Sequence, residues 1–138
     1  MKKILGLLPL LLVFWSCEVE GDLTRTQAKS LDQATAQLKY SGNFVGTPGI
    51  AVIGQAKIYL EGNRYRVQLE NFSISDGPDL KVYLSKGATP TEFVSLGNLT
   101  AATVYEIPKE VVVANYSHVL IHCQQYNHLY AIAPLNAN

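Results

Sequence analysis

The sequence contains few of the residues that mark several common classes of protein. Its 138 residues include only two cysteines and one tryptophan, and 11 lysines and arginines balance 11 aspartates and glutamates. A domain that binds nucleic acid normally has a basic face, so the zero formal net charge argues against such a partner. The chain has no long run of like charge, no internal repeat and no low-complexity segment. Its length predicts one globular domain.

The motifs of the common catalytic classes are absent as well. The sequence has no serine or cysteine triad pattern, no phosphate-binding loop, no zinc-finger spacing and no haem-attachment motif. These absences favour a protein that is not an enzyme. No cofactor is predicted, although copper, zinc and haem are not excluded by the sequence.

The N-terminus resembles the leader of a bacterial lipoprotein. Lys2 and Lys3 precede an apolar block, residues 4–15, that is well short of the ~20 residues needed to span a bilayer. Cys17 ends this block, and the chain is polar from Glu18 onward. We expect residues 1–16 to be a signal peptide and Cys17 to be lipidated. Residues 17–37 would then tether a domain to a membrane of the bacterial cell envelope, facing the periplasm or the cell surface.

Two features leave alternatives open in this region. Phe14 and Trp15 are bulkier than the residues that usually precede a lipidated cysteine. The alternative is therefore ordinary cleavage by signal peptidase without lipidation. A transmembrane anchor is a second, less favoured alternative. A short helix from about Thr26 is compatible with the apolar spacing that follows, but we expect any such helix to be marginal.

From Leu38 onward the sequence changes to short alternating runs separated by turn residues, which is typical of all-β proteins. In residues 64–69, for example, Val67 and Leu69 fall on one face and arginines on the other. Residues 110–116 are compatible with a strand or a short helical turn. We expect residues 38–138 to form an antiparallel β-sandwich of about eight strands, with a small closed barrel as the alternative. The expected strands span residues 38–45, 51–60, 64–69, 80–84, 93–96, 104–107, 119–123 and 129–133.

The stretch from Ser117 to Leu129 contains the cysteine of greatest interest. If Cys17 carries lipid, Cys123 has no partner for an intramolecular disulfide. Strand alternation places Cys123 on the same face as Val119 and Ile121, which favours a buried core residue. The other interpretation is an accessible redox thiol activated by a neighbouring histidine. Both interpretations remain open at this point.

Several other side chains are candidates for chemistry or binding. His122 and His128 would meet across a hairpin through residues 125–127, but a metal site shared with Cys123 is disfavoured because adjacent strand residues point to opposite faces. No metal ligand is therefore predicted. We interpret Asp79 as a residue that caps backbone groups in its own turn. Tyr59 and Tyr83 point outward, either as a surface for stacking sugars or peptides or as cross-strand pairs.

Two blocks of the sequence resemble the DM-thirteen family, also called the electron-transfer DM domain. The first block is residues 71–74 and 76–85, and the second is residues 105–108, 116–123 and 130–135, within a similarity that extends from about Ser41 to Leu135. The resemblance implies a β-sandwich in which Cys123 serves redox chemistry. We take His122, His128, Tyr126 and Asp79 as candidate neighbours of the site. Two positions depart from the family pattern: His122 stands where an aromatic residue is usual, and Ala131 where a glycine is usual.

Together these observations predict an exported, membrane-anchored lipoprotein with a thiol-based redox or electron-transfer role through Cys123. Its partner would be an unidentified redox partner or another envelope protein. The alternative is a non-catalytic binding or structural module of the cell envelope, which would use strand faces or the loop around Gly77.

Overall fold

The computed structural model describes residues 31–32 and 34–138. The expected signal peptide, the expected lipidation at Cys17 and the start of the expected helix at Thr26 lie outside the described residues. No helix within the described part of the chain is long and apolar enough to cross a membrane.

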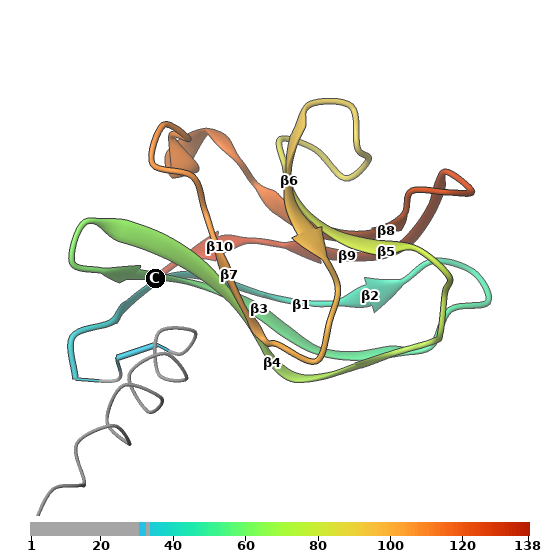
Figure 1. Ribbon diagram of the computed structural model, residues 1–138, viewed down its shortest axis with the longest axis horizontal. Helices are drawn as coiled ribbons and strands as arrows, with labels where there is room; N and C mark the ends of the chain where they lie inside the picture. The colour runs from blue at the N-terminus through green and yellow to red at the C-terminus, as the bar shows by residue number, and fades with distance from the viewer. Residues whose placement is uncertain (1–30, 33) are drawn as a thin grey trace, which may run out of the picture. The chain divides into compact units, whose positions relative to one another are not determined.

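Two antiparallel five-stranded sheets pack face to face and form a β-sandwich (Figure 1). The strand order is β10-β1-β3-β4-β7 in the first sheet and β2-β9-β8-β5-β6 in the second. The strands are β1 (Gln37–Asn43), β2 (Val45–Gly46), β3 (Val52–Glu61), β4 (Arg64–Ile74), β5 (Leu80–Ser85), β6 (Phe93–Asn98), β7 (Val104–Glu106), β8 (His118–Cys123), β9 (His128–Pro134) and β10 (Asn136–Ala137). The predicted fold class is confirmed. The eight predicted strands correspond to β1 and β3–β9, and the two further strands, β2 and β10, have two residues each and are too short to show alternation.

The core lies between the two sheets and is built from the alternating side chains of their strands. Val67 and Leu69 of β4 face inward from the first sheet, as predicted. Val82 and Leu84 of β5 face them from the second sheet and are fully buried. Each such side chain contributes about 1.5–3 kcal/mol when it leaves water, so this layer is the main source of stability.

Two connections close the ends of the sandwich. The hydroxyl of Tyr105 donates a hydrogen bond to the carbonyl of Ala102 (2.9 Å) and accepts one from the Thr100 N–H (3.2 Å), which holds the chain between β6 and β7. The segment 110–116, predicted as a strand or a helical turn, contains a 3-10 turn over Val113–Asn115. Val113 is buried in the core, so the helical alternative was correct.

The outer face of the first sheet has a polar cluster centred on Glu70. Lys57 Nζ lies 2.9 Å from Glu70 Oε1, and the Tyr59 hydroxyl donates to Glu70 Oε2 at 3.0 Å. The hydrogen bond from the Lys57 ammonium holds the pKa of the Glu70 carboxyl below its ordinary value of 4.5. The hydroxyl of Tyr59 is therefore committed to a neighbour within the sheet.

Replacing Glu70 with glutamine should reduce the free energy of unfolding at pH 7 by about 0.5–1 kcal/mol. Because the pKa of Glu70 is lowered on folding, its charge stabilises the protein above its unfolded pKa, and this contribution is lost as pH falls through the lowered value. The Glu70→Gln variant and the unmodified protein should be equally stable at about pH 2, where the Glu70 carboxyl is protonated. Denaturant unfolding at both pH values measures the difference. An equal loss at pH 7 and at low pH would contradict the role of the charge.

Candidate functional site

Cys123 ends strand β8 and points into the core. Its side chain is 1% exposed and packs in the same cluster as Val119 and Ile121, on the face that strand alternation predicted. Within the described residues it is a free cysteine with no disulfide partner. The residues that follow it, 124–127, form an exposed turn that leads into β9. The thiol is thus buried in the folded protein but lies directly beside a solvent-exposed turn.

The strand register places His128, and not His122, beside Cys123. Cys123 pairs with Leu80 on one side and with His128 on the other, and residues opposite each other share a face. A register shift after Ile121 pairs His122 with Leu129 on the opposite face. The predicted meeting of His122 and His128 across the hairpin was therefore wrong. Within the described residues, no three His, Cys, Asp or Glu side chains are gathered so as to hold a metal ion.

The two remaining predicted neighbours, Asp79 and Tyr126, have different surroundings. The Gln124 N–H donates to the backbone carbonyl of Asp79 (3.0 Å), which joins the loop before β5 to the residue after Cys123. The carboxylate of Asp79, predicted to cap backbone groups, instead contacts Lys81 Nζ at 3.2 Å. Tyr126 is 66% exposed on the hairpin turn and faces solvent.

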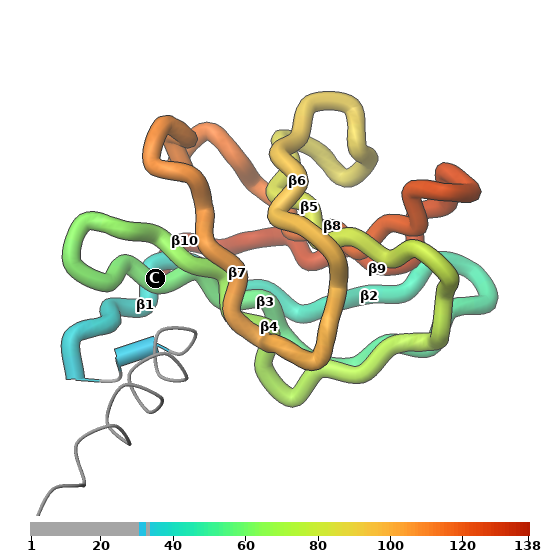
Figure 2. Tube along the Cα trace, in the orientation of Figure 1, coloured from blue at the N-terminus to red at the C-terminus, as the bar shows by residue number. Residues whose placement is uncertain are grey.

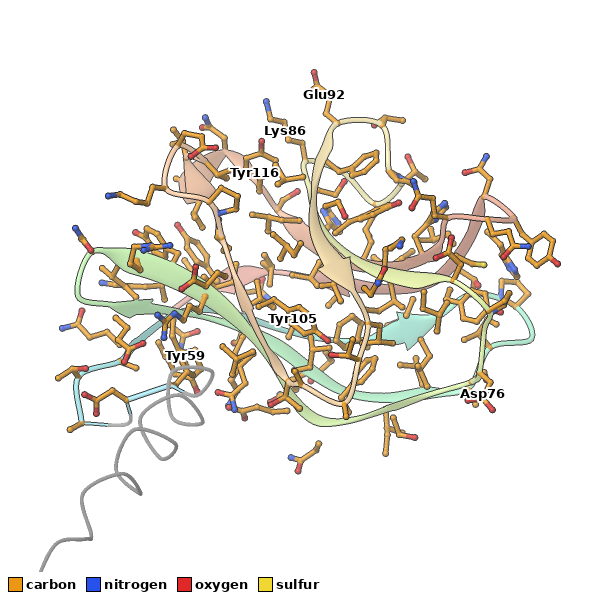
Figure 3. All side chains as sticks on the ribbon, in the orientation of Figure 1. Tyr59, Asp76, Lys86, Glu92, Tyr105 and Tyr116 are labelled. Atoms are coloured by element: carbon orange, nitrogen blue, oxygen red, sulfur yellow. The ribbon has the colours of Figure 1, made fainter. Side chains whose placement is uncertain are left out.

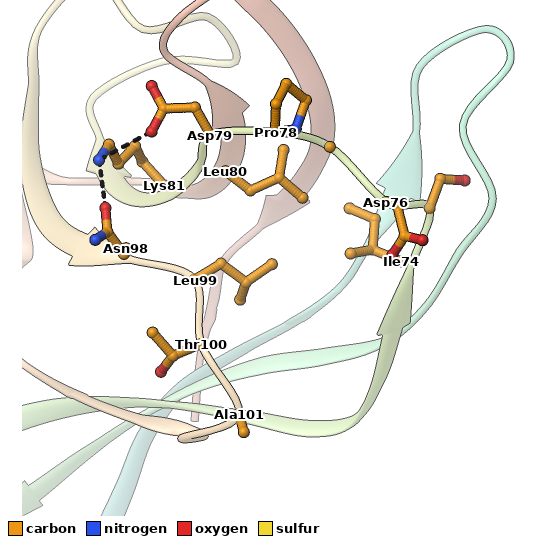
Figure 4. A pocket seen from close by; sticks show the side chains of 12 residues that line it. Ile74, Asp76, Pro78, Asp79, Leu80, Lys81, Asn98, Leu99, Thr100 and Ala101 are labelled. Atoms are coloured by element: carbon orange, nitrogen blue, oxygen red, sulfur yellow. Dashed lines mark hydrogen bonds and ion pairs between the residues drawn. The ribbon is translucent and has the colours of Figure 1, made fainter.

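A cavity of about 610 Å³ opens between residues 74–81 and residues 98–101 (Figure 4). We call it the loop cavity. Leu80 and Leu99 supply apolar surface, and Lys81 lies between the carboxylate of Asp79 and the amide oxygen of Asn98. The sequence indicated the loop around Gly77 as a binding region. It did not indicate residues 98–101, because nothing local shows which distant loop folds against the first one.

Gly77 lies close to two side chains, which would have to shift to make room for a Cβ at this position. A Cβ there would lie 2.8 Å from Leu80 Cδ2 and 2.9 Å from the Tyr130 hydroxyl oxygen. That hydroxyl donates to the carbonyl of Asp76 at 3.3 Å. The rim of the loop cavity is thereby fastened to β9.

The outer face of the second sheet holds a further buried cluster, separate from the core between the sheets. Tyr83 was predicted to be an exposed outward residue, but it is only 3% exposed. The Phe93 ring stacks on the Tyr83 ring, with centroids 4.1 Å apart. The adjoining loop of residues 86–92 (Figure 2) is held by hydrogen bonds from the Ser85 hydroxyl to the carbonyls of Thr89 (3.1 Å) and Glu92 (3.4 Å). Figure 3 shows Lys86 and Glu92 projecting from this loop. Burial, together with the nearby charge of Asp79, raises the pKa of Tyr83 above its ordinary value.

These features define a class: a β-sandwich domain with one enclosed free thiol in the described residues and a cavity formed by the loops at one end. The model of the family described as Electron transfer DM13 matches residues 46–135, which is more than half of the chain. The protein belongs to this family, as the sequence resemblance predicted. No curated protein and no solved structure matches the chain.

Proposed function

We propose that this protein is a lipid-anchored electron-transfer protein of the bacterial cell envelope and that Cys123 is its redox group. Membership of the Electron transfer DM13 family supports the electron-transfer role. The observation that carries the assignment to Cys123 is a free thiol at the end of β8, inside the matched range and beside an exposed turn. The basic and apolar leader that ends at Cys17 supports the lipid anchor and the exported location.

The burial of the sulfur restricts the chemistry. A thiolate must reach its target, so exchange requires the turn of residues 124–127 to move away from Cys123. In the proposed step, Cys123 Sγ attacks a disulfide of a partner protein and a mixed disulfide forms. The sulfur that leaves carries away the electron pair of the broken bond. The leaving sulfur is thereby reduced to a thiolate, and Cys123 is oxidised as one half of the mixed disulfide.

The native protein should form one mixed disulfide with glutathione disulfide, a small disulfide probe, and the Cys123→Ala variant should form none there. If the hairpin opens locally, the reaction rate should not depend on low concentrations of denaturant, because local opening exposes little surface. Mass spectrometry of the quenched reaction gives both the adduct and the rate. Val119→Ala is the matched control: it removes a buried side chain from the same strand face but leaves the thiol, so it should retain the adduct.

A reaction that occurs only in unfolded protein would overturn the redox role of Cys123. The rate would then rise steeply with denaturant, because global unfolding exposes a large surface. The thiol would be a core residue and nothing more.

The loop cavity favours a second candidate function, a non-catalytic binding module of the envelope. Its volume of about 610 Å³ lies within the range of ligand pockets. The carboxylate of Asp76 and the apolar surface of Leu80 and Leu99 suit a partner that presents a basic group beside an apolar one. Binding of this kind should survive Cys123→Ala and be weakened by Asp76→Asn. The glutathione adduct, in contrast, should be lost in Cys123→Ala and retained in Asp76→Asn.

A further inference from the structure

A smaller pocket lies on the outer face of the second sheet, on the side of β8 that faces away from Cys123. Its volume is about 210 Å³, and we call it the outer pocket. It is lined by Tyr83, Pro90, Phe93, His122, Gln124 and Asn127. His122 and Cys123 are consecutive residues of one strand and point to opposite faces, so the outer pocket is separate from the redox group proposed above.

One wall of the outer pocket is a stack of three rings. The ring centroids of Phe93 and Tyr83 lie 4.1 Å apart with an interplanar angle of 22°. The Tyr83 ring stacks in turn on the His122 ring, with centroids 5.5 Å apart and an angle of 28°. Tyr83 is enclosed, whereas Phe93 is 41% exposed. Phe93 thus presents an accessible flat apolar surface that is held in place by the rings behind it.

The other wall is polar, and it contains a buried acceptor without a partner. His122 is 4% exposed, and its Nε2 lies 3.0 Å from the Asn127 side-chain oxygen. An amide oxygen only accepts, so Nε2 is the donor in this hydrogen bond, and in that tautomer of the neutral ring Nδ1 is an acceptor. Within the described residues, Nδ1 is buried and has no hydrogen-bond partner. Buried polar atoms are normally paired, so this nitrogen indicates a ligand or water that donates a hydrogen bond.

The lining of the outer pocket limits the ligands that would suit it. No lysine, arginine, aspartate or glutamate lines it, so neither a phosphate nor a cation would find a counter-charge. Gln124 and Asn127 supply amide groups that both donate and accept. A volume of 210 Å³ corresponds to about seven waters at about 30 Å³ each, which is room for one ring and not for an extended chain.

We propose that the outer pocket binds one neutral sugar residue. The apolar C–H face of the sugar ring packs on Phe93, and its hydroxyls exchange hydrogen bonds with the side-chain amides of Gln124 and Asn127. The ligand is either a free monosaccharide or the terminal residue of a longer glycan, since both present the same ring.

Saturation-transfer NMR on the full chain tests this proposal with glucose, galactose and N-acetylglucosamine as probes. At least one of them should bind with a dissociation constant in the millimolar range, on the order of 1–10 mM. Phe93→Leu keeps an apolar cover but removes the flat ring, and it should weaken binding about tenfold. Asn127→Gly removes the amide that holds His122, at a position whose φ of 50° suits glycine, and should weaken binding by a similar factor.

Tyr126→Ala is the matched control, because Tyr126 lies on the same turn but does not line the outer pocket. Its affinity should equal that of the unmodified protein. The proposal is overturned if none of the three sugars binds with a dissociation constant below about 100 mM, or if Phe93→Leu and Asn127→Gly, shown to be folded by denaturant unfolding, bind as tightly as the control. The disaccharides lactose and chitobiose distinguish a free monosaccharide from the terminal residue of a longer glycan. If the NMR saturation is confined to the terminal ring of the disaccharide, the ligand is a glycan end. If the disaccharides do not bind, the ligand is a free monosaccharide. Because Cys123→Ala leaves the outer pocket intact, failure of the redox role leaves this result unchanged.

Discussion

A thiol reagent should modify Cys123 in the native protein more than about tenfold more slowly than in the unfolded chain. The side chain is 1% exposed and packed among core residues, so the reagent reaches the sulfur only when the structure opens. An opening free energy of about 4 kcal/mol slows the reaction by about three powers of ten. Global stabilities of small domains are larger than this value, and local openings are smaller. The measured slowing therefore reports the free energy of the opening that exposes the thiol.

The measurement follows labelling with a fluorogenic maleimide in a chain that carries Cys17→Ser, so that one thiol remains. The same chain in concentrated guanidinium gives the unfolded rate. Tyr126→Cys, placed in a chain that also carries Cys123→Ala, gives a positive control, because position 126 is exposed on the adjacent turn. This control should react as fast as an unfolded thiol. A native rate for Cys123 within tenfold of the control would mean that the hairpin turn does not shield the sulfur.

The alternation of apolar residues was sufficient to predict the fold and the position of Cys123. Val67, Leu69, Val82 and Leu84 lie where the two-residue period places them, and so does the thiol. Each of these positions depends on one strand having one buried face, which is a local property of the sequence.

The surroundings of Cys123 were not predictable in the same way. The register shift after Ile121 moves the partner of each of the next two residues by one position, so that His128 lies opposite Cys123 and Leu129 lies opposite His122. A bulge of this kind depends on how two strands pair, and the composition of one strand does not reveal it. Both candidate histidines lie on the hairpin that carries Cys123, and the register places only His128 opposite the thiol.

The outer pocket was missed for a different reason. Strand alternation assigns Tyr83 to the outer face of its sheet, and this assignment is correct. An outer face is exposed only if nothing covers it, and here the Phe93 ring stacks on the Tyr83 ring. Such a contact depends on tertiary structure, which has no periodic signal. For the same reason the sequence indicated one rim of the loop cavity and not the other.

Replacing Gly42 with alanine should destabilise the protein by about 3 kcal/mol or more. Gly42 lies in β1, where the chain passes from the first sheet toward β2 of the second. A Cβ at this position would lie 1.9 Å from the carbonyl oxygen of Pro134 and 2.8 Å from its carbonyl carbon. Both are backbone atoms at the end of β9, and Pro134 is paired with His118 of β8. Neither side can yield without moving a paired strand, so the clash cannot be relieved by a change of rotamer.

Thermal unfolding should show the melting temperature falling by about 12 °C or more, since 1 kcal/mol corresponds to about 4–8 °C in a domain of this size. Gly87→Ala is the matched control: a Cβ there meets nothing within 4 Å, and its φ is not in the left-handed region. Its melting temperature should stay the same or rise slightly. If Gly42→Ala melted as the control does, the close approach of β1 to β9 would be wrong.

The Gly42→Ala variant also distinguishes the two routes by which Cys123 becomes exposed. If the thiol reacts only through global unfolding, a loss of about 3 kcal/mol should speed native labelling about a hundredfold, since 1.4 kcal/mol is a factor of ten. If the thiol reacts through local opening of the turn at residues 124–127, the rate should hardly change, because that turn lies at the opposite end of β8 and β9 from Pro134. The redox role proposed for Cys123 requires the second result. A hundredfold acceleration would assign Cys123 to the core and leave the binding-module function as the better account of the protein.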